Sequence, residues 1–137
     1  MGRVVAIDYG SKRVGLATTD ALRMFATALD TVHSKDLIAY LKAYHAREVI
    51  ETFVLGEPKT VKNLPSDTAA QIQEFAVHLQ RTFPGIPVVR VDERFTSKIA
   101  LQAIAKSDLN KKQRQDKGLV DQISAVLILQ TYLEQHP

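Results

Sequence analysis

The chain of 137 residues contains no cysteine. This absence excludes disulfide bonds, a thiol nucleophile and any thiolate site for zinc or an iron–sulfur cluster. Long apolar runs are also missing, because the longest, from Ala125 to Leu129, is far shorter than the roughly 20 residues that cross a bilayer. The N-terminus enters a strand pattern directly, without the apolar region of a secretion signal. We therefore predict a cytoplasmic protein without a membrane partner.

The composition shows no strong bias toward any class of residue. Glycine and proline are few, at 6 and 5 residues, while 45% of the chain is apolar and 24% is charged, as in ordinary globular proteins. The length fits one domain, since domains usually have roughly 100–150 residues, so we expect a single domain over residues 1–137. The formal charge of +3 leans only weakly toward a polyanionic partner.

The order of the predicted elements indicates an α/β fold. Residues 3–7 form a β-branched apolar run typical of a buried strand, and a glycine turn connects it to an alternating strand at 14–19. Further strands are predicted around 25–31, at 49–56 and at 88–91. Helices are predicted at 34–47 with Ser34 as the cap, from 66 or 67 to 83, from 96 or 97 to 105, and at 118–134. In such a pattern the later strands join the first in parallel.

Three acidic residues stand at the margins of predicted buried elements. Asp8 ends the first strand, Glu93 follows the fifth, and Asp121 lies in the most apolar helix. Each has a structural explanation, since Asp8 can cap the following turn, Glu93 can pair with a nearby arginine, and Asp121 can complement the positive N-terminus of its helix.

Asp121 is the hardest of the three to explain by structure alone, because its helical stripe continues through Ala125 and Ile128. A carboxylate that faces a core needs a partner. Ligands of such sheets bind beyond the carboxyl ends of the parallel strands, where we expect all three acids to converge if the elements pack together. Converging carboxylates repel one another unless a cation lies among them, and an all-oxygen cluster suits Mg²⁺ or Mn²⁺. Two such ions about 4 Å apart can promote phosphodiester hydrolysis, so the acids favour a nuclease.

Four stretches of the sequence carry a resemblance to a known family. They are IDYGSKRVGLA at 7–17, LGEP at 55–58, DERFTS at 92–97 and KGLVDQISA at 117–125. In this order and spacing they resemble the Holliday junction resolvase-like, pre-16S ribosomal RNA nuclease family of bacteria, which has a ribonuclease-H-like fold. The resemblance covers nearly the whole chain. It implies a five-stranded sheet in the order 3-2-1-4-5 with helices on both faces.

The same resemblance implies a function and a set of site residues. Asp8, Glu93 and Asp121 are implied as the metal-binding catalytic acids, with Mg²⁺ or Mn²⁺ as the cofactor. The implied reaction is metal-dependent hydrolysis of phosphodiester bonds, in maturation of the 5′ end of pre-16S ribosomal RNA, with ribosomal particles as further partners. An alternative is a Holliday junction resolvase acting on branched DNA.

Two positions depart from what the resemblance leads us to expect. Junction resolvases of similar fold tend to carry another acid one helical turn after the last, where this chain has Ser124, so junction cleavage is the less secure inference. The family more often has an apolar residue at the position of Glu57. This acid either adds a metal ligand or faces solvent, and we favour solvent.

Basic residues cluster in and after the predicted site loops. They are candidates for contacts with nucleic-acid phosphates, or else solvated side chains that keep loops polar. The candidates are Lys12, Arg13, Arg94, Lys98, Lys111, Lys112, Arg114 and Lys117.

Two other functions compete with nuclease activity. The turn Asp8-Tyr9-Gly10-Ser11-Lys12 also resembles the phosphate loop of actin-like ATPases, but those proteins close two such domains around ATP and this length allows one. A noncatalytic nucleic-acid-binding module is expected if the acids do not converge.

Overall fold

The computed structural model describes residues 2–10, 12–20, 25–57, 67–92 and 117–135, and at positions 57, 67–69, 92 and 117–121 it describes the backbone alone. Its strands are β1 (Arg3–Asp8), β2 (Arg13–Thr19), β3 (Ala26–His33), β4 (Ile50–Glu57) and β5 (Val88–Asp92). Its helices are the 3₁₀ turn η1 (Ser34–Asp36), α1 (Leu37–Arg47), α2 (Asp67–Thr82) and α5 (Lys117–Gln135).

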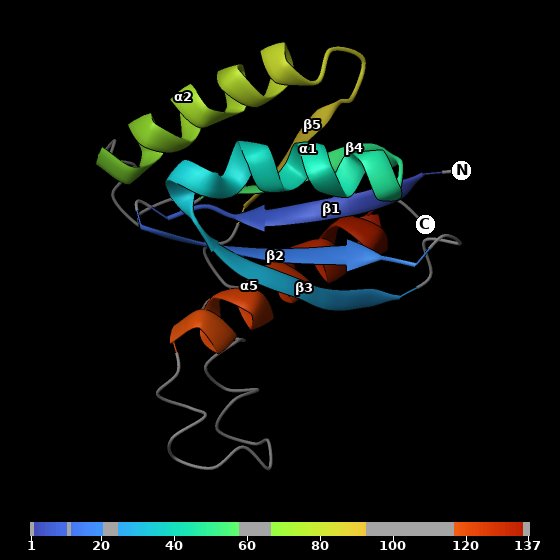
Figure 1. Ribbon diagram of the computed structural model, residues 1–137. Coiled ribbons are helices and arrows are strands. Elements are labelled where there is room, and N and C mark those ends of the chain that lie inside the picture. The colour runs from blue at the N-terminus through green and yellow to red at the C-terminus, as the bar shows by residue number, and fades with distance from the viewer. Residues whose placement is uncertain (1, 11, 21–24, 58–66, 93–116, 136–137) are drawn as a thin grey trace.

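One mixed sheet organises these elements, in the strand order β3-β2-β1-β4-β5. β1, β2 and β3 form an antiparallel meander, whereas β4 and β5 continue the sheet in parallel with β1. Helices α1 and α2 cover one face and α5 covers the other (Figure 1). The predicted fold class, strand order and two-sided helix packing are therefore confirmed. The helix predicted at 96–105 lies outside the described residues.

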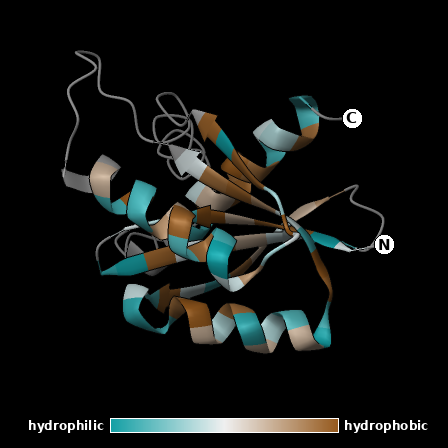
Figure 2. Ribbon diagram, turned by 90° about the horizontal axis from the view of Figure 1, so that it is seen from above, coloured by the Kyte–Doolittle hydropathy of each residue, from teal (hydrophilic) through white to brown (hydrophobic). Residues whose placement is uncertain are grey.

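The face under α1 and α2 carries the larger apolar core. Alternate residues of β1 such as Val5 and Ile7 are fully buried there, together with Phe53 of β4 and Leu41 of α1. Figure 2 shows hydrophobic residues along the central strands and hydrophilic residues interspersed along the helices. This distribution is what the period of 3.6 residues in amphipathic helices produces.

The opposite face is built from smaller residues. Ala6 of β1 and Ala17 of β2 are completely buried under Ala125, Ile128 and Leu129 of α5. Because side chains alternate along a strand, the even-numbered residues of β1 belong to this face. The face that carries Asp8 is thus the one that α5 covers.

The entry into α1 differs from the prediction that Ser34 caps this helix. Ser34 begins the 3₁₀ turn instead, and α1 starts only at Leu37. The ring nitrogen Nδ1 of His33 accepts a hydrogen bond from the backbone N–H of Lys35 at 3.2 Å and so fills the capping role. Because histidine is a less common cap than serine or threonine, the sequence pattern favoured Ser34 and placed the cap one residue after His33.

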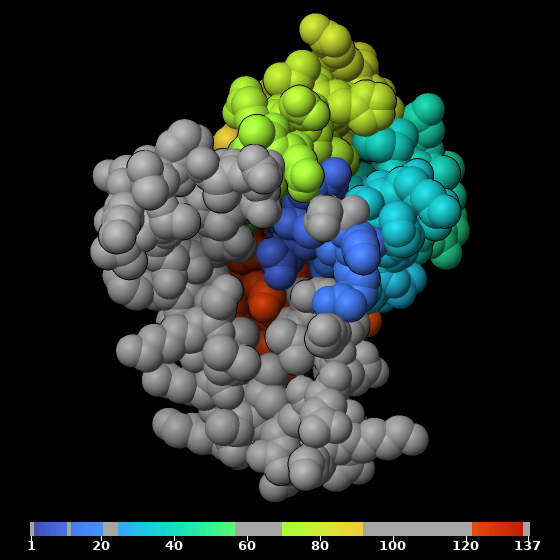
Figure 3. Space-filling model, turned by 90° about the vertical axis from the view of Figure 1, so that its left-hand side faces the viewer, coloured from blue at the N-terminus to red at the C-terminus, as the bar shows by residue number. Residues whose placement is uncertain are grey.

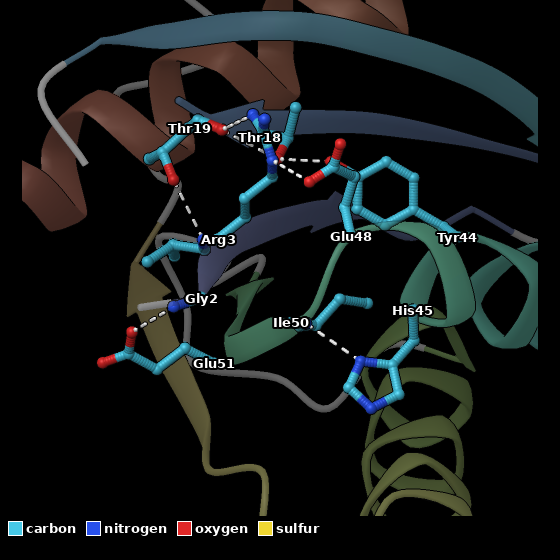
Figure 4. A network of polar contacts seen from close by, with 10 residues as sticks. Gly2, Arg3, Thr18, Thr19, Tyr44, His45, Glu48, Ile50 and Glu51 are labelled. Atoms are coloured by element: carbon cyan, nitrogen blue, oxygen red, sulfur yellow. Dashed lines mark hydrogen bonds and ion pairs between the residues drawn. The ribbon is translucent and has the colours of Figure 1, made fainter. Parts of the chain in front are cut away.

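Polar contacts tie the sheet together at the amino end of β1 (Figure 4). The Arg3 guanidinium donates to the backbone oxygen of Thr19 at 2.9 Å and to the Glu48 carboxylate at 3.1 Å. Nearby, Nδ1 of His45 accepts from the backbone N–H of Ile50 at 2.9 Å. These contacts link β1, β2 and the α1–β4 connection, so they hold the strands together at the amino end of β1.

In the described part of the chain, no helix is both long and apolar enough to cross a bilayer.

Candidate functional site

Asp8 is the last residue of β1 and is half-buried on the face covered by α5. Its partner on β2 is Gly15. On the other side, the pairing of Ile7 with Leu55 places Gly56 of β4 beside it. Asp8 is therefore flanked on both neighbouring strands by a residue that has no side chain.

Helix α5 begins over this same level of the sheet. The side-chain amide of Gln122 donates to the Thr31 hydroxyl of β3 at 3.0 Å. Thr31 pairs with Gly15, and Gly15 pairs with Asp8, so the three residues form one row across the sheet. At a strand spacing of about 4.8 Å, Thr31 and Asp8 are roughly 10 Å apart. Asp121 precedes Gln122 in the first turns of α5, beside this row.

Asp121 belongs to a helical stripe whose later members are buried against the sheet. Ala125, one turn later, and Ile128, two turns later, are fully buried against it. The direction of α5 also places its start at this end of the sheet, because Leu133, in its last turn, lies near Ala26 at the opposite end. Seen from the carboxyl end of β1, atoms of β1 and α5 lie next to each other at the centre of this face (Figure 3).

The third predicted acid follows β5. Asp92 is the last residue of that strand and pairs with Glu57, the last residue of β4. Both strands therefore end on the same side of the sheet as β1, with β4 between β1 and β5. Glu93 comes directly after Asp92 in the sequence and lies outside the described residues, as do Arg94 and Lys98.

A hard divalent cation fits what this end of the sheet offers. The donor that the structure describes is the Asp8 carboxylate, an oxygen ligand of the kind that Mg²⁺ and Mn²⁺ prefer. Its strand partners Gly15 and Gly56 have no side chains that could compete as ligands. Among the described residues, no group of three or more histidine, cysteine or acidic side chains gathers either here or at another place.

Two of the predicted phosphate-binding residues lie at this end as well. Lys12 and Arg13 are exposed where the chain enters β2. Arg13 pairs with His33 of β3, and the backbone N–H of Ser34 donates to the carbonyl of Lys12 at 3.2 Å. Lys117 starts α5, whereas Lys111, Lys112 and Arg114 lie outside the described residues.

The structure adds Lys35 to this basic surface. It is exposed in η1, close to Lys12 and Arg13 because the end of β3 pairs with the start of β2. Sequence reasoning missed it, since 22 positions separate it from Arg13. The strand pairing that joins them could have been found from the predicted hairpin register, had the end of the third strand been placed at His33.

A separate groove lies far from the acids. It has a volume of about 420 Å³ and is lined by Phe25, Ala26, Gln130, Leu133 and Glu134. Phe25 is 65% exposed, but Asp8 and Gln122 lie toward the other end of β1 and α5. The groove therefore takes no part in the candidate site.

Comparison with known proteins connects this geometry to a family. The RuvX family, described as Holliday junction resolvase, matches residues 2–135. A protein of Parabacteroides distasonis with the name "Putative pre-16S rRNA nuclease" is 52% identical over 134 residues, covering 98% of this chain and 96% of that protein. A protein of the same name from Flavobacterium johnsoniae is 49% identical over 133 residues, covering 97% of this chain and 96% of the relative.

Solved structures show the same fold at lower sequence identity. T. thermophilus RuvC in complex with Holliday junction substrate matches with a TM-score of 0.59 at 18% identity, over 99% of this chain and 97% of that one. Fowlpox virus resolvase with Holliday junction DNA matches with a TM-score of 0.58 at 16% identity, over 97% of both chains. These neighbours confirm the predicted ribonuclease-H-like fold.

Proposed function

Because this chain belongs to the RuvX Holliday junction resolvase family, we propose that it is a metal-dependent endonuclease that matures the 5′ end of pre-16S ribosomal RNA. Relatives with about half of their residues identical, matched over nearly their full length, are named for pre-16S rRNA. Residues 1–137 would form one nuclease domain that acts in the cytoplasm, on precursor RNA alone or in ribosomal particles. Its family and these relatives identify the chain as a hydrolase of phosphodiester bonds.

The observation that carries this proposal is the surroundings of Asp8. Asp8 ends β1 between Gly15 and Gly56, and Gln122, the residue after Asp121, contacts Thr31 in the same row of the sheet. We assign Asp8, Glu93 and Asp121 as the acids that hold Mg²⁺ or Mn²⁺. When bound, the cation supplies activation of a water molecule and stabilisation of charge at the leaving oxygen of the phosphodiester.

The chain's own residues would position the substrate. Lys12, Arg13 and Lys35 would contact backbone phosphates on one side, and such contacts fix the register of nucleic acid without reading its sequence. Arg94, Lys98, Lys111, Lys112, Arg114 and Lys117 are assigned the same role from the sequence.

Cleavage of two labelled substrates tests the proposal directly. Precursor 16S rRNA and a four-way DNA junction are incubated with the protein in Mg²⁺, in Mn²⁺ and in chelator. We expect cation-dependent cleavage of the RNA precursor near the mature 5′ end. No cleavage of the precursor under any of these conditions would contradict the proposal.

Branched DNA is the second candidate substrate. The family description and both solved structures name Holliday junctions, and this chain shares the fold of those structures. Against it, the position one turn after Asp121 is Ser124, which is only 7% exposed against the sheet. The further acid that junction resolvases tend to carry is therefore replaced by a small buried side chain, which favours the RNA substrate.

The basic surface formed by Lys12, Arg13 and Lys35 gives a prediction about salt. Replacing all three by alanine should weaken RNA binding and reduce the slope of log affinity against log salt by about 2, since each phosphate contact contributes roughly 0.7 on a single strand. Fluorescence anisotropy with a labelled precursor fragment at several salt concentrations measures both quantities.

A control for the loss of positive charge is available at the C-terminal ends of α1 and α2. Arg47 and Arg81 are exposed in the last turns of α1 and α2, away from Asp8. Their double alanine variant should keep the wild-type slope. Equal slopes for the wild type and the triple variant would remove this surface from the proposed interface.

A further inference from the structure

Thr31 and Gln122 form a side-chain hydrogen bond between residues that are 91 positions apart. The amide nitrogen Nε2 of Gln122 donates to Oγ1 of Thr31 at 3.0 Å, and the contact is partly buried. It joins the second half of β3, in the outermost strand of the meander, to the first turns of α5. Residues this distant in sequence meet only because the fold brings them together, so the contact reports on how α5 sits on the sheet.

The position of this bond relative to the acids is specific. Thr31 ends the row that runs through Gly15 to Asp8, and Gln122 directly follows Asp121. One partner is thus in register with the first acid and the other is adjacent to the last. Between them Gly15 contributes no side chain, so β2 offers no side-chain contact to the helix in this row.

The apolar contacts that the structure describes for α5 lie beyond Gln122. Among the side chains of this helix that the structure describes, the fully buried ones are Ala125, Ile128 and Leu129, one to two turns after Gln122. They pack against small residues such as Ala6 and Ala17. Apolar contacts have no preferred direction and helix ends fray, so the rotation and height of the first turns need a directional contact. The bond between Gln122 and Thr31 is such a contact.

The strand partner is itself held from the other face. The carboxylate of Asp30, the residue before Thr31, accepts from the Thr31 backbone N–H at 2.7 Å and from the hydroxyl of Tyr40 on α1. Burial and the nearby Asp30 charge raise the pKa of Tyr40, so the phenol keeps its proton at neutral pH. These contacts of Asp30 therefore hold the part of β3 from which the Thr31 hydroxyl contacts α5.

We propose that Thr31 and Gln122 are positioning residues of the nuclease centre: their hydrogen bond sets the rotation and height of the first turns of α5, and with them the spacing between the carboxylates of Asp8 and Asp121. The inference rests on the proposed function. Neither residue touches the substrate or the cation in this role. The bond acts by holding two acids at the separation at which they share a divalent cation.

The experiment measures Mn²⁺ affinity, kcat and KM in variants that remove one partner without changing its size. Thr31→Val replaces the hydroxyl by a methyl group, and Gln122→Met keeps the length of the side chain without its amide. Each should weaken Mn²⁺ binding, followed by electron paramagnetic resonance, by about tenfold or more, as is typical when a contact that orients a metal ligand is lost. kcat should fall while KM for the RNA stays near the wild-type value.

Three comparisons distinguish positioning from a general loss of structure. Thr31→Ser keeps a hydroxyl and should recover most of the affinity. The double variant Thr31→Val/Gln122→Met should be no worse than either single variant, because both remove the same bond. Thr27→Val is the matched control. Thr27 lies near the start of β3, and its hydroxyl donates to the backbone oxygen of Thr18 at 3.1 Å. This variant should bind Mn²⁺ as the wild type does.

The possible results separate this inference from the proposed function. Wild-type Mn²⁺ affinity and kcat in Thr31→Val, or an equal loss in Thr27→Val, would overturn the positioning role and leave the nuclease assignment intact. A wild-type protein that binds Mn²⁺ through Asp8 but cleaves no RNA would contradict the proposed substrate, while the affinities would still decide the positioning role. A wild-type protein that binds no Mn²⁺ would contradict both.

Discussion

Asp8→Asn is expected to lower the rate of precursor-RNA cleavage by more than about a hundredfold. Loss of a group that merely orients a metal ligand costs about 10- to 100-fold, and Asp8 is proposed to be a ligand itself. Asparagine keeps the shape of the side chain at the end of β1 but removes the charge that holds the cation. Single-turnover cleavage of labelled precursor 16S rRNA in Mg²⁺ measures the effect.

Glu93→Gln and Asp121→Asn should show losses of the same order, because the three acids act as one unit and such effects are not additive. Asp36→Asn is the matched control: Asp36 lies at the same end of the sheet, is exposed, and makes no side-chain cap to α1. It should cleave at close to the wild-type rate. Wild-type rates in all three site variants would contradict the assignment of the acids.

Thermal melts show whether the Asp8 variant has lost a ligand rather than its fold. In chelator, Asp8→Asn should melt at or above the wild-type temperature, because one of three mutually repelling carboxylates is gone. Excess Mg²⁺ should raise the melting temperature of the wild type more than that of the variant, since a ligand of the native state stabilises it by mass action. A turn-capping role for Asp8 alone would give equal shifts in both proteins.

Ile128→Ala is expected to reduce the free energy of unfolding by about 2–5 kcal/mol. The Ile128 side chain is completely buried between α5 and the sheet, and replacing a buried isoleucine by alanine leaves a cavity in addition to the lost apolar transfer energy. Urea unfolding followed by circular dichroism measures the loss.

Gln130→Ala on the same helix supplies the control for this change. Gln130 is exposed, and surface substitutions usually alter stability by less than about 0.5 kcal/mol. Cleavage by folded Ile128→Ala should also fall, because the helix that carries Asp121 docks through this residue. Wild-type stability in Ile128→Ala would show that α5 does not depend on this packing.

Much of the fold could be predicted because its signals are local. The apolar run of residues 3–7 reads as a buried strand, and the stripe of Ile72, Phe75 and Leu79 reads as one face of α2, as the structure confirms. The strand order came from the resemblance to a family and not from these patterns. Periodicity shows which residues are buried, but it does not show which strands are neighbours.

The candidate site was predictable in its residue types and only partly in its arrangement. Asp8 follows its apolar strand in the sequence, so its place at a sheet end was visible. Gly15 and Gly56 flank Asp8 because of the strand register. Thr31 contacts Gln122 because of the position of α5 on the sheet. These are tertiary properties for which a single sequence carries no local signal.

The most direct test of the central claim is an anomalous difference map from crystals grown with Mn²⁺. The account predicts a manganese peak within coordination distance of the Asp8 carboxylate, with Asp121 and Glu93 completing the same site. Manganese peaks found only elsewhere on the protein, with none at Asp8, would contradict it.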